Sequence, residues 1–213
     1  MLRYLFYLLI VKPLVLIVLG INARNRELLL NKGPAIVVAN HNSHLDALAL
    51  MSLFPQRVIA DVHPVAAADY FLTNRWLKWF AINVVGIIPI NRNTPTAGRD
   101  LMSPILDALD RNGILIFFPE GTRGEPESMG KMKNGIASIV SLRPDVPVTP
   151  VFFYGLGKSL PKGEVILVPF FVDAFIGKPL LWHENKQDFM ARLNAEMASL
   201  QSMAIQAAAK KEE

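Results

Sequence analysis

Short apolar runs and segments with helical spacing alternate along most of this chain. The strands expected from this pattern are 35–39, 57–61, 84–90, 113–118, 146–154 and 165–172, and the helices are 45–53, 66–81, 96–111, 133–142 and 188–203. The run 113–118 is continuously apolar, as strands buried on both faces are. Strands that alternate with helices predict an α/β fold in which helices flank a mainly parallel central sheet.

The most apolar stretch, Tyr4 to Gly20, lies near the N-terminus. Its 17 residues reach only the short limit of a spanning helix, Lys12 makes a span costly, and Pro13 is expected to kink or split the helix. We therefore expect a membrane-embedded hairpin or an interfacial anchor. A signal peptide and a buried core helix are the alternatives, although no small-x-small cleavage site follows the stretch.

Three regions follow from this pattern. Residues 1–33 are expected to be the membrane anchor, residues 34–206 the globular domain, and residues 207–213 a polar tail. The boundary after residue 33 is drawn at the turn signal Lys32-Gly33-Pro34.

The charge distribution agrees with a membrane-associated protein. Residues 1–33 carry the whole net charge of +4, whereas residues 34–213 contain 17 basic and 17 acidic side chains. A basic face for nucleic acid is therefore not expected, and the excess charge lies where an anionic membrane surface would be met. The chain has no cysteine, which excludes a disulfide framework and a thiol nucleophile.

The first candidate for chemistry is the segment 40–46, directly after the strand 35–39. In open α/β sheets, ligands gather outside the carboxyl ends of strands. His41 and Asp46 can meet there only if His41 lies in the turn and Asp46 in the first turn of the next helix, because on one continuous helix they would be about 140° apart. Asp46 would then orient the imidazole while its other nitrogen takes a proton.

Two other interpretations compete for these residues. Ser43 and Asp46 have the spacing of a capping box, which needs no catalysis. His41, His44 and Asp46 are also possible metal ligands, but no further ligand pair of recognisable spacing follows.

A second cluster, residues 118–123, follows the most buried strand. Gly121 permits close backbone approach. Arg123 offers a planar fork suited to phosphate, and Glu120 would orient such cations or bind a substrate hydroxyl. The alternative is a turn with a local Glu120–Arg123 ion pair. A third segment, 86–92, ends in Arg92, which would add a second cation, and a fourth, 146–151, has two prolines that indicate an edge, a bulge or a turn.

These four segments, in this order, resemble the four sequence blocks of the glycerolipid acyltransferase family, which includes the lysophosphatidic acid acyltransferases. The blocks are His41-x4-Asp46, Gly86 to Arg92, Phe118-Pro-Glu-Gly-Thr-Arg123 and Val146 to Val151, and Lys133-Asn134-Gly135 resembles the lysine-x-glycine that follows the third block. The resemblance spans roughly residues 35–155.

The resemblance implies an O-acyltransferase that moves a fatty acyl group from acyl-CoA or acyl-carrier protein to a lysophospholipid hydroxyl, with 1-acylglycerol-3-phosphate as acceptor. His41 would be the base and Asp46 would orient it. The residues implied to bind the acceptor are Arg92, Glu120, Gly121, Thr122, Arg123 and Lys133. No cofactor and no metal are expected, and the protein is expected to associate with membrane lipid at the cytoplasmic face.

Three alternatives remain open from the residues. The acceptor is another lyso-lipid, since two acids at Glu125 and Glu127 follow the third block. The protein is a metal-dependent hydrolase that uses His41, His44 and Asp46. Or it is a catalytically silent lipid-binding module.

Overall fold

The computed structural model describes residues 2–68, 74–90, 102–159 and 171–212. Its described strands form one sheet in the order β1-β7-β6-β2-β5-β3-β4. The strands are β1 (Ile21–Arg24), β2 (Ala35–Ala39), β3 (Val62–Ala67), β4 (Ile88–Ile90), β5 (Ile114–Phe117), β6 (Val148–Tyr154) and β7 (Val172–Ile176). All neighbours are parallel except β6 and β7. The predicted α/β class with a mainly parallel sheet is therefore confirmed.

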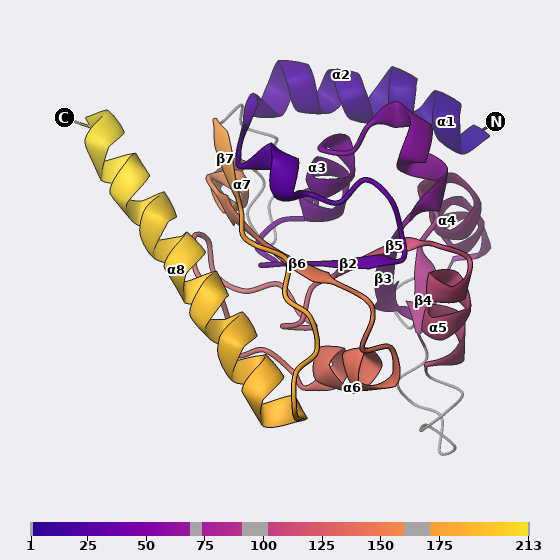
Figure 1. The fold of residues 1–213 in the computed structure, drawn as a ribbon. Coiled ribbons are helices and arrows are strands. Elements are labelled where there is room, and N and C mark those ends of the chain that lie inside the picture. The colour runs from indigo at the N-terminus through magenta and orange to yellow at the C-terminus, as the bar shows by residue number, and fades with distance from the viewer. Residues whose placement is uncertain (1, 69–73, 91–101, 160–170, 213) are drawn as a thin grey trace.

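Helices cover both faces of this sheet (Figure 1). The longer helical elements are α3 (Asp46–Ser52), α4 (Arg75–Phe80), α5 (Ser103–Asp110), α6 (Gly135–Leu142) and α8 (Lys186–Glu212). Shorter ones are η3 (Arg26–Leu28), η4 (Gln56–Asp61), η6 (Ala81–Val85) and α7 (Leu156–Ser159). Figure 1 shows the N-terminal helix along one side of the sheet and α6 along the other.

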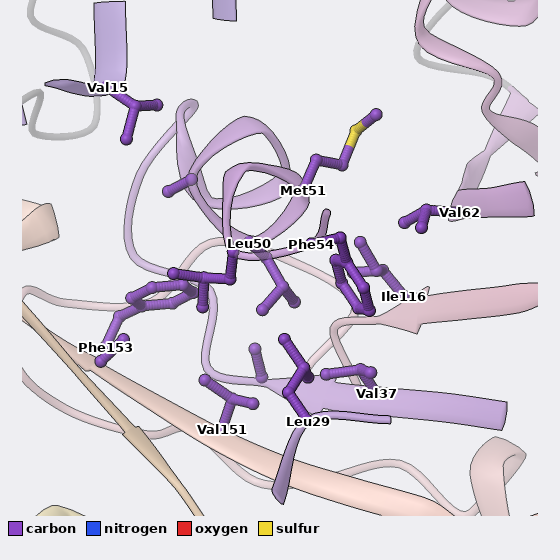
Figure 2. Packing of buried hydrophobic residues seen from close by; sticks show 14 of the residues in the cluster. Val15, Leu29, Val37, Leu50, Met51, Phe54, Val62, Ile116, Val151 and Phe153 are labelled. Carbon is purple, nitrogen blue, oxygen red and sulfur yellow. The ribbon is translucent and has the colours of Figure 1, made fainter. Parts of the chain in front are cut away.

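The central strand β2 divides the core into two layers, because successive side chains of a strand point to opposite faces. Val37 lies in the layer that contains α3, whereas Ile36 and Val38 lie in the layer formed with α5, α6 and α8. Figure 2 shows the first layer, in which Leu50 and Phe54 from the α3 region pack over Val37. β2 is buried throughout, so both faces of the sheet hold it in place.

The first helix, which we define as residues 2–19, is one continuous rod. It consists of α1 (Leu2–Phe6), η1 (Tyr7–Val11), α2 (Lys12–Leu14) and η2 (Val15–Leu19), in which η1 and η2 are π-helical turns on either side of the turn that contains Pro13. Pro13 therefore neither splits this helix nor turns it into a hairpin; it lies in α2, between the two π-helical turns.

One side of the first helix packs on the domain, and the opposite side is exposed. Tyr7, Val11, Val15 and Leu19 are buried, and the hydroxyl of Tyr7 donates to the carbonyl of Phe54 at 2.9 Å. The exposed apolar side chains of the helix are Leu2, Tyr4, Leu5, Leu8, Leu9, Ile10 and Ile17. Across residues 2–68, 74–90, 102–159 and 171–212, no helix combines the length and the apolar character needed to cross a membrane.

Several boundaries differ from the sequence expectation. The predicted strand 57–61 is the 3-10 helix η4, and the strand β3 begins one residue later, at Val62. The first residues of the predicted helix 66–81 belong to β3, residues 69–73 lie outside the described part, and α4 covers Arg75–Phe80. The predicted strand 84–90 shortens to β4 because 81–85 is a π-helical turn.

Other differences concern the ends of the chain and the undescribed parts. β1 lies within the segment 1–33 expected to be the anchor, so part of that segment joins the sheet. The helix α8 continues through the expected tail to Glu212. Residues 96–101 of the expected helix 96–111 and residues 165–170 of the expected strand 165–172 lie outside the described part.

A polar contact ties the end of α8 to the outer strands. Asp173 on β7 accepts hydrogen bonds from Lys211 Nζ at 2.6 Å and from Asn22 Nδ2 at 2.8 Å, and Arg24 lies at 3.8 Å. Burial alone would raise the pKa of Asp173, but Lys211, Asn22 and Arg24 outweigh it and lower that pKa.

This contact predicts an acid-sensitive contribution to stability. Because the folded-state pKa of Asp173 is depressed, its contribution is present above the unfolded value of about 3.9 and is lost as pH falls through the folded value. Asp173→Asn should lower the free energy of unfolding by about 1 kcal/mol or more at neutral pH, and the difference from wild type should vanish in acid. Denaturant titrations at several pH values measure it, with the exposed Asp107→Asn on α5 as control. A pH-independent difference would contradict the linkage.

Candidate active site

Two loops meet at the carboxyl edge of the central strands. β2 and β5 are parallel neighbours, with Val37 opposite Ile116 and Val38 opposite Phe117. The loop 40–45 after β2 and the loop 118–134 after β5 therefore leave the sheet at the same edge. The first two candidate clusters from the sequence, residues 40–46 and 118–123, lie in these loops, with Asp46 at the start of α3.

Asp46 is the buried centre of the first loop. Its Oδ2 accepts hydrogen bonds from His41 Nδ1 at 2.7 Å, from the Asn42 amide at 2.7 Å and from the Ser43 amide at 2.9 Å. Burial raises the pKa of this carboxyl, while His41 and the Ser43 and Asn42 amides oppose the rise. The carboxylate thus closes the turn and holds the ring as well. The N-cap of α3 is Leu45 and not Ser43, so the capping box is not formed as expected.

His41 remains accessible while its orientation is fixed. Its side chain is 24% exposed, and its ring stacks on Phe118 with centroids 4.4 Å apart and planes at 23°. Since Asp46 binds Nδ1, Nε2 is the nitrogen left to accept a proton from a bound molecule. The contact expected from the five-residue offset is therefore present, because α3 begins at Asp46 and leaves His41 in the turn.

Two asparagines that the sequence analysis did not assign hold His41 from either side. Asn40 donates to the Phe153 carbonyl at 3.0 Å and accepts from the Phe153 amide at 2.7 Å, which ties the end of β2 to β6. Asn42 donates to the Ser128 carbonyl at 3.0 Å and also to the Glu125 carbonyl. Both are buried. Their position on either side of His41, directly after an apolar strand, is the sequence feature that could have indicated their role in holding the loop.

Glu120 braces the same loop from the second cluster. Its Oε1 accepts from the His41 amide at 2.7 Å and its Oε2 from the Gly130 amide at 2.8 Å. The residue is only 6% exposed. Burial raises the pKa of Glu120, and these two amides oppose the rise. Each oxygen of this carboxylate thus contacts the backbone of the protein itself.

Gly121 and Lys133 lie together beside this brace. Gly121 has a φ of +73°, and a β-carbon added there would stand 2.7 Å from Lys133 Nζ. Only glycine accepts this dihedral without strain. The Lys133 amide donates to the Pro119 carbonyl at 2.9 Å. Lys133 is therefore held next to the second cluster as a cation, and Thr122 is exposed nearby in the chain.

Arg123 contacts His44 and not Glu120, so the local ion pair considered from the sequence is not the contact that the structure has. The guanidinium donates to Nε2 of His44, and a ring nitrogen that accepts such a bond is unprotonated. Burial, and then the charge of Arg123 and His41, lower the pKa of His44 against the opposing effect of Asp46. His44 thus connects Arg123 to the His41 loop.

Of the residues proposed from the sequence, the structure brings together His41, Asp46, Glu120, Gly121, Arg123 and Lys133. Arg92 lies outside the described residues. In the part of the chain that is described, no cluster of three or more His, Cys, Asp or Glu side chains is arranged to hold a metal ion.

Two surface cavities lie elsewhere. One of about 540 Å³ is lined by Asp61, His63 and Arg111, among others, at the amino ends of β3 and β5. The other, of about 500 Å³, lies between Arg24, Phe175 and Lys211. Neither contains His41, so the assignment of the candidate site rests on the side-chain geometry of the two loops.

A family comparison agrees with this geometry. The sequence model of the acyltransferase family matches residues 20–154, which include both loops and the strands β1 to β6. The chain belongs to the acyltransferase family.

Curated relatives in this family include a chloroplastic 1-acyl-sn-glycerol-3-phosphate acyltransferase of Arabidopsis thaliana, 32% identical over 163 residues. The match covers 74% of this chain and 42% of the relative. The human 1-acyl-sn-glycerol-3-phosphate acyltransferase alpha is 32% identical over 124 residues, which cover 55% of this chain and 40% of the relative. The chain thus spans less than half the length of these two relatives.

A solved structure shares the fold of this acyltransferase family member. The crystal structure of the 1-acyl-sn-glycerophosphate acyltransferase PlsC from Thermotoga maritima superimposes with a TM-score of 0.69 at 19% identity. The superposition covers 87% of this chain and 72% of PlsC.

The double contact of Glu120 generates a prediction. Glu120→Gln replaces one acceptor oxygen by an NH₂ donor, so either the His41 or the Gly130 amide loses its acceptor. We expect the free energy of unfolding to fall by about 1–3 kcal/mol, and hydrogen exchange of these two amides to accelerate. Glu125→Gln, an exposed glutamate of the same loop, is the control. Unchanged exchange at both amides would rule out the brace.

Proposed function

We propose that the protein transfers a fatty acyl group from a thioester donor, acyl-CoA or acyl-carrier protein, to the free hydroxyl of a lysophospholipid. The acceptor that we propose is 1-acylglycerol-3-phosphate. The observation that carries the proposal is the 2.7 Å contact between His41 Nδ1 and Asp46 Oδ2 in a turn that leaves the ring accessible. The names of the relatives support the acceptor.

In the proposed reaction, His41 Nε2 removes the proton from the acceptor hydroxyl. The oxygen attacks the thioester carbonyl, and a tetrahedral intermediate forms with a negative charge on the former carbonyl oxygen. When this intermediate collapses, the carbon–sulfur bond breaks, and the thiolate takes the proton from the His41 imidazolium. The products are the acylated lipid and a free thiol, so no covalent acyl-enzyme is needed.

Asp46 supports each step of this cycle. Its negative charge stabilises the imidazolium that forms after proton transfer, and its bond to Nδ1 directs Nε2 outward. The stack on Phe118 further restricts the ring. Holding the two substrates in line would supply a large share of the rate, and the base would add a factor on the order of 10²–10⁴.

The cations beside the ring support a phosphate-bearing acceptor. Arg123 reaches the His41 loop through His44, and Lys133 lies over Gly121. A guanidinium offers paired donors that match phosphate oxygens. We propose that Arg123 and Lys133, with Arg92 and Thr122, bind the acceptor phosphate. Glu120, whose two oxygens contact backbone amides, would hold the loop that carries Arg123 and Lys133 to the His41 loop.

We further propose that the protein works at a membrane surface, with the first helix as its anchor. The exposed side of that helix carries Leu5, Leu9 and Ile10, and residues 1–33 carry the net positive charge. An amphiphilic acceptor resides in a bilayer, so an enzyme that binds the same surface meets it at high local concentration.

The base and its partner can be tested by thiol release from acyl-CoA with a panel of lyso-lipids, together with mass detection of the acylated product. His41→Ala and Asp46→Asn should each lower kcat by about 10²-fold or more. His183→Ala, which alters an exposed histidine near α8, should have no effect. Thiol release by wild type that does not require a lyso-lipid would contradict acyl transfer and indicate thioester hydrolysis.

The phosphate role of Arg123 has its own test. Arg123→Ala should raise the KM for lysophosphatidate about 10-fold or more, because a hydrogen bond to a charged group contributes about 1.5–3 kcal/mol, and should leave the KM for acyl-CoA unchanged. A phosphate-free acceptor, monoacylglycerol, should be insensitive to the substitution. Arg192→Ala, an exposed arginine on α8, is the matched control. Equal increases in both KM values would refute the role.

A further inference from the structure

The helix α4 presents an apolar face to solvent. Trp76 is 82% exposed and Trp79 50% exposed, and Phe80 and Ile82 are exposed as well. These side chains point outward from a helix that is capped at its N-terminus. The N-cap Asn74 accepts hydrogen bonds through Oδ1 from the Trp76 amide at 2.9 Å and the Leu77 amide at 3.3 Å.

The inner side of the same segment is already buried against the domain. Ala81, Val84 and Val85 in η6 are buried, so the segment docks on the domain through these residues and not through its tryptophans. Trp76, Trp79 and Phe80 have the i, i+3, i+4 spacing that places them on one face of the helix. An exposed aromatic face of this kind marks an interaction site.

The apolar face of α4 continues into that of the first helix. The rings of Phe6 and Phe80 meet edge to face with centroids 5.2 Å apart. Beyond this contact, the first helix exposes Leu2, Leu5 and Leu9. The two helices therefore present a common surface from two segments that are far apart in the sequence.

The charges around this surface identify its occupant. Arg75 and Lys78 are exposed on α4, next to the tryptophans. Tryptophans with lysine or arginine beside them are typical of the interface between lipid headgroups and acyl chains. Each basic residue near an anionic leaflet adds to the attraction.

We propose that α4 is a second membrane-binding element, whose Trp76 and Trp79 insert into the interface of an anionic lipid bilayer beside the first helix. Lipid binding by α4 stands on its own observations. Its consequence for catalysis rests on the proposed function: α4 follows the carboxyl end of β3, which is parallel to β5 and β2, so a bilayer bound there lies toward the edge that holds His41.

The test uses the full chain and vesicles of phosphatidylcholine with and without phosphatidylglycerol. The double variant Trp76→Gln, Trp79→Gln should bind vesicles roughly ten-fold more weakly than wild type, because it removes two large apolar side chains from the lipid. The control is Leu142→Gln with Met203→Gln, which are also exposed apolar residues but lie on α6 and α8 in the other layer, and which should leave binding unchanged.

Two further measurements separate insertion from simple attraction. Arg75→Gln with Lys78→Gln should weaken binding to anionic vesicles by about five-fold for each charge and leave binding to neutral vesicles unaltered. Phospholipids brominated on their acyl chains should quench the fluorescence of wild type. The chain has three tryptophans, so the double tryptophan variant retains only Trp182, and this quenching should disappear.

The proposal is overturned if the double tryptophan variant binds vesicles as wild type does. It is also overturned if the tryptophans prove to be covered by protein, with a dimer or complex that depends on them and no quenching by brominated lipid. Circular dichroism spectra and melting temperatures equal to those of wild type show that the variants fold. Acyl transfer to a dispersed short-chain acceptor is measured in parallel: if wild type fails there, the proposed function is wrong, whatever the vesicles show.

Discussion

One carboxylate oxygen organises the candidate site. Asp46 Oδ2 accepts hydrogen bonds from the His41 ring and from two successive backbone amides. This is possible only because a turn separates β2 from α3. The same three bonds set the turn, begin the helix and fix the imidazole. Folding and ring orientation are therefore coupled at this residue, and a buried carboxylate with three N–H donors is stable only while all of them are in place.

The second loop depends on the first through contacts that run in both directions. The His41 amide donates to Glu120, and the His41 carbonyl accepts from the Gly124 amide at 2.8 Å. Asn42 adds contacts to the loop carbonyls. Since β2 and β5 are adjacent and parallel, both loops start from a fixed separation. The backbone of His41 is thus held at its amide and its carbonyl, and the position of its ring is linked to that of Arg123.

The parts that sequence reasoning predicted well are those in which local pattern and tertiary environment agree. β2 and β5 are continuous apolar runs that the fold buries on both faces, and the His41–Asp46 contact follows from a strand, a turn and a helix start in immediate succession. The segment 57–61 was misassigned because the apolar trio Val58-Ile59-Ala60 suits a strand, whereas the chain there turns into β3. β1 has little apolar character, and only its pairing with β7 defines it. The contacts of Asn40 with Phe153 and of Glu120 with His41 join residues 113 and 79 positions apart, and no local pattern encodes them.

The orientation of the first helix connects fold and chemistry. Its buried side, with Tyr7 and Val11, packs against the layer that also holds α3, so the helix that begins at Asp46 lies between the sheet and the first helix. If this helix served only to cover the core, Leu5 and Leu9 on its outer side would add nothing to the stability of the isolated chain, because they are exposed and bury no surface there. The membrane contact that we propose accounts for both apolar sides: the helix would then join a bilayer to the layer that positions Asp46. Under that proposal, an acceptor would keep its acyl chain in the membrane while its hydroxyl reaches His41.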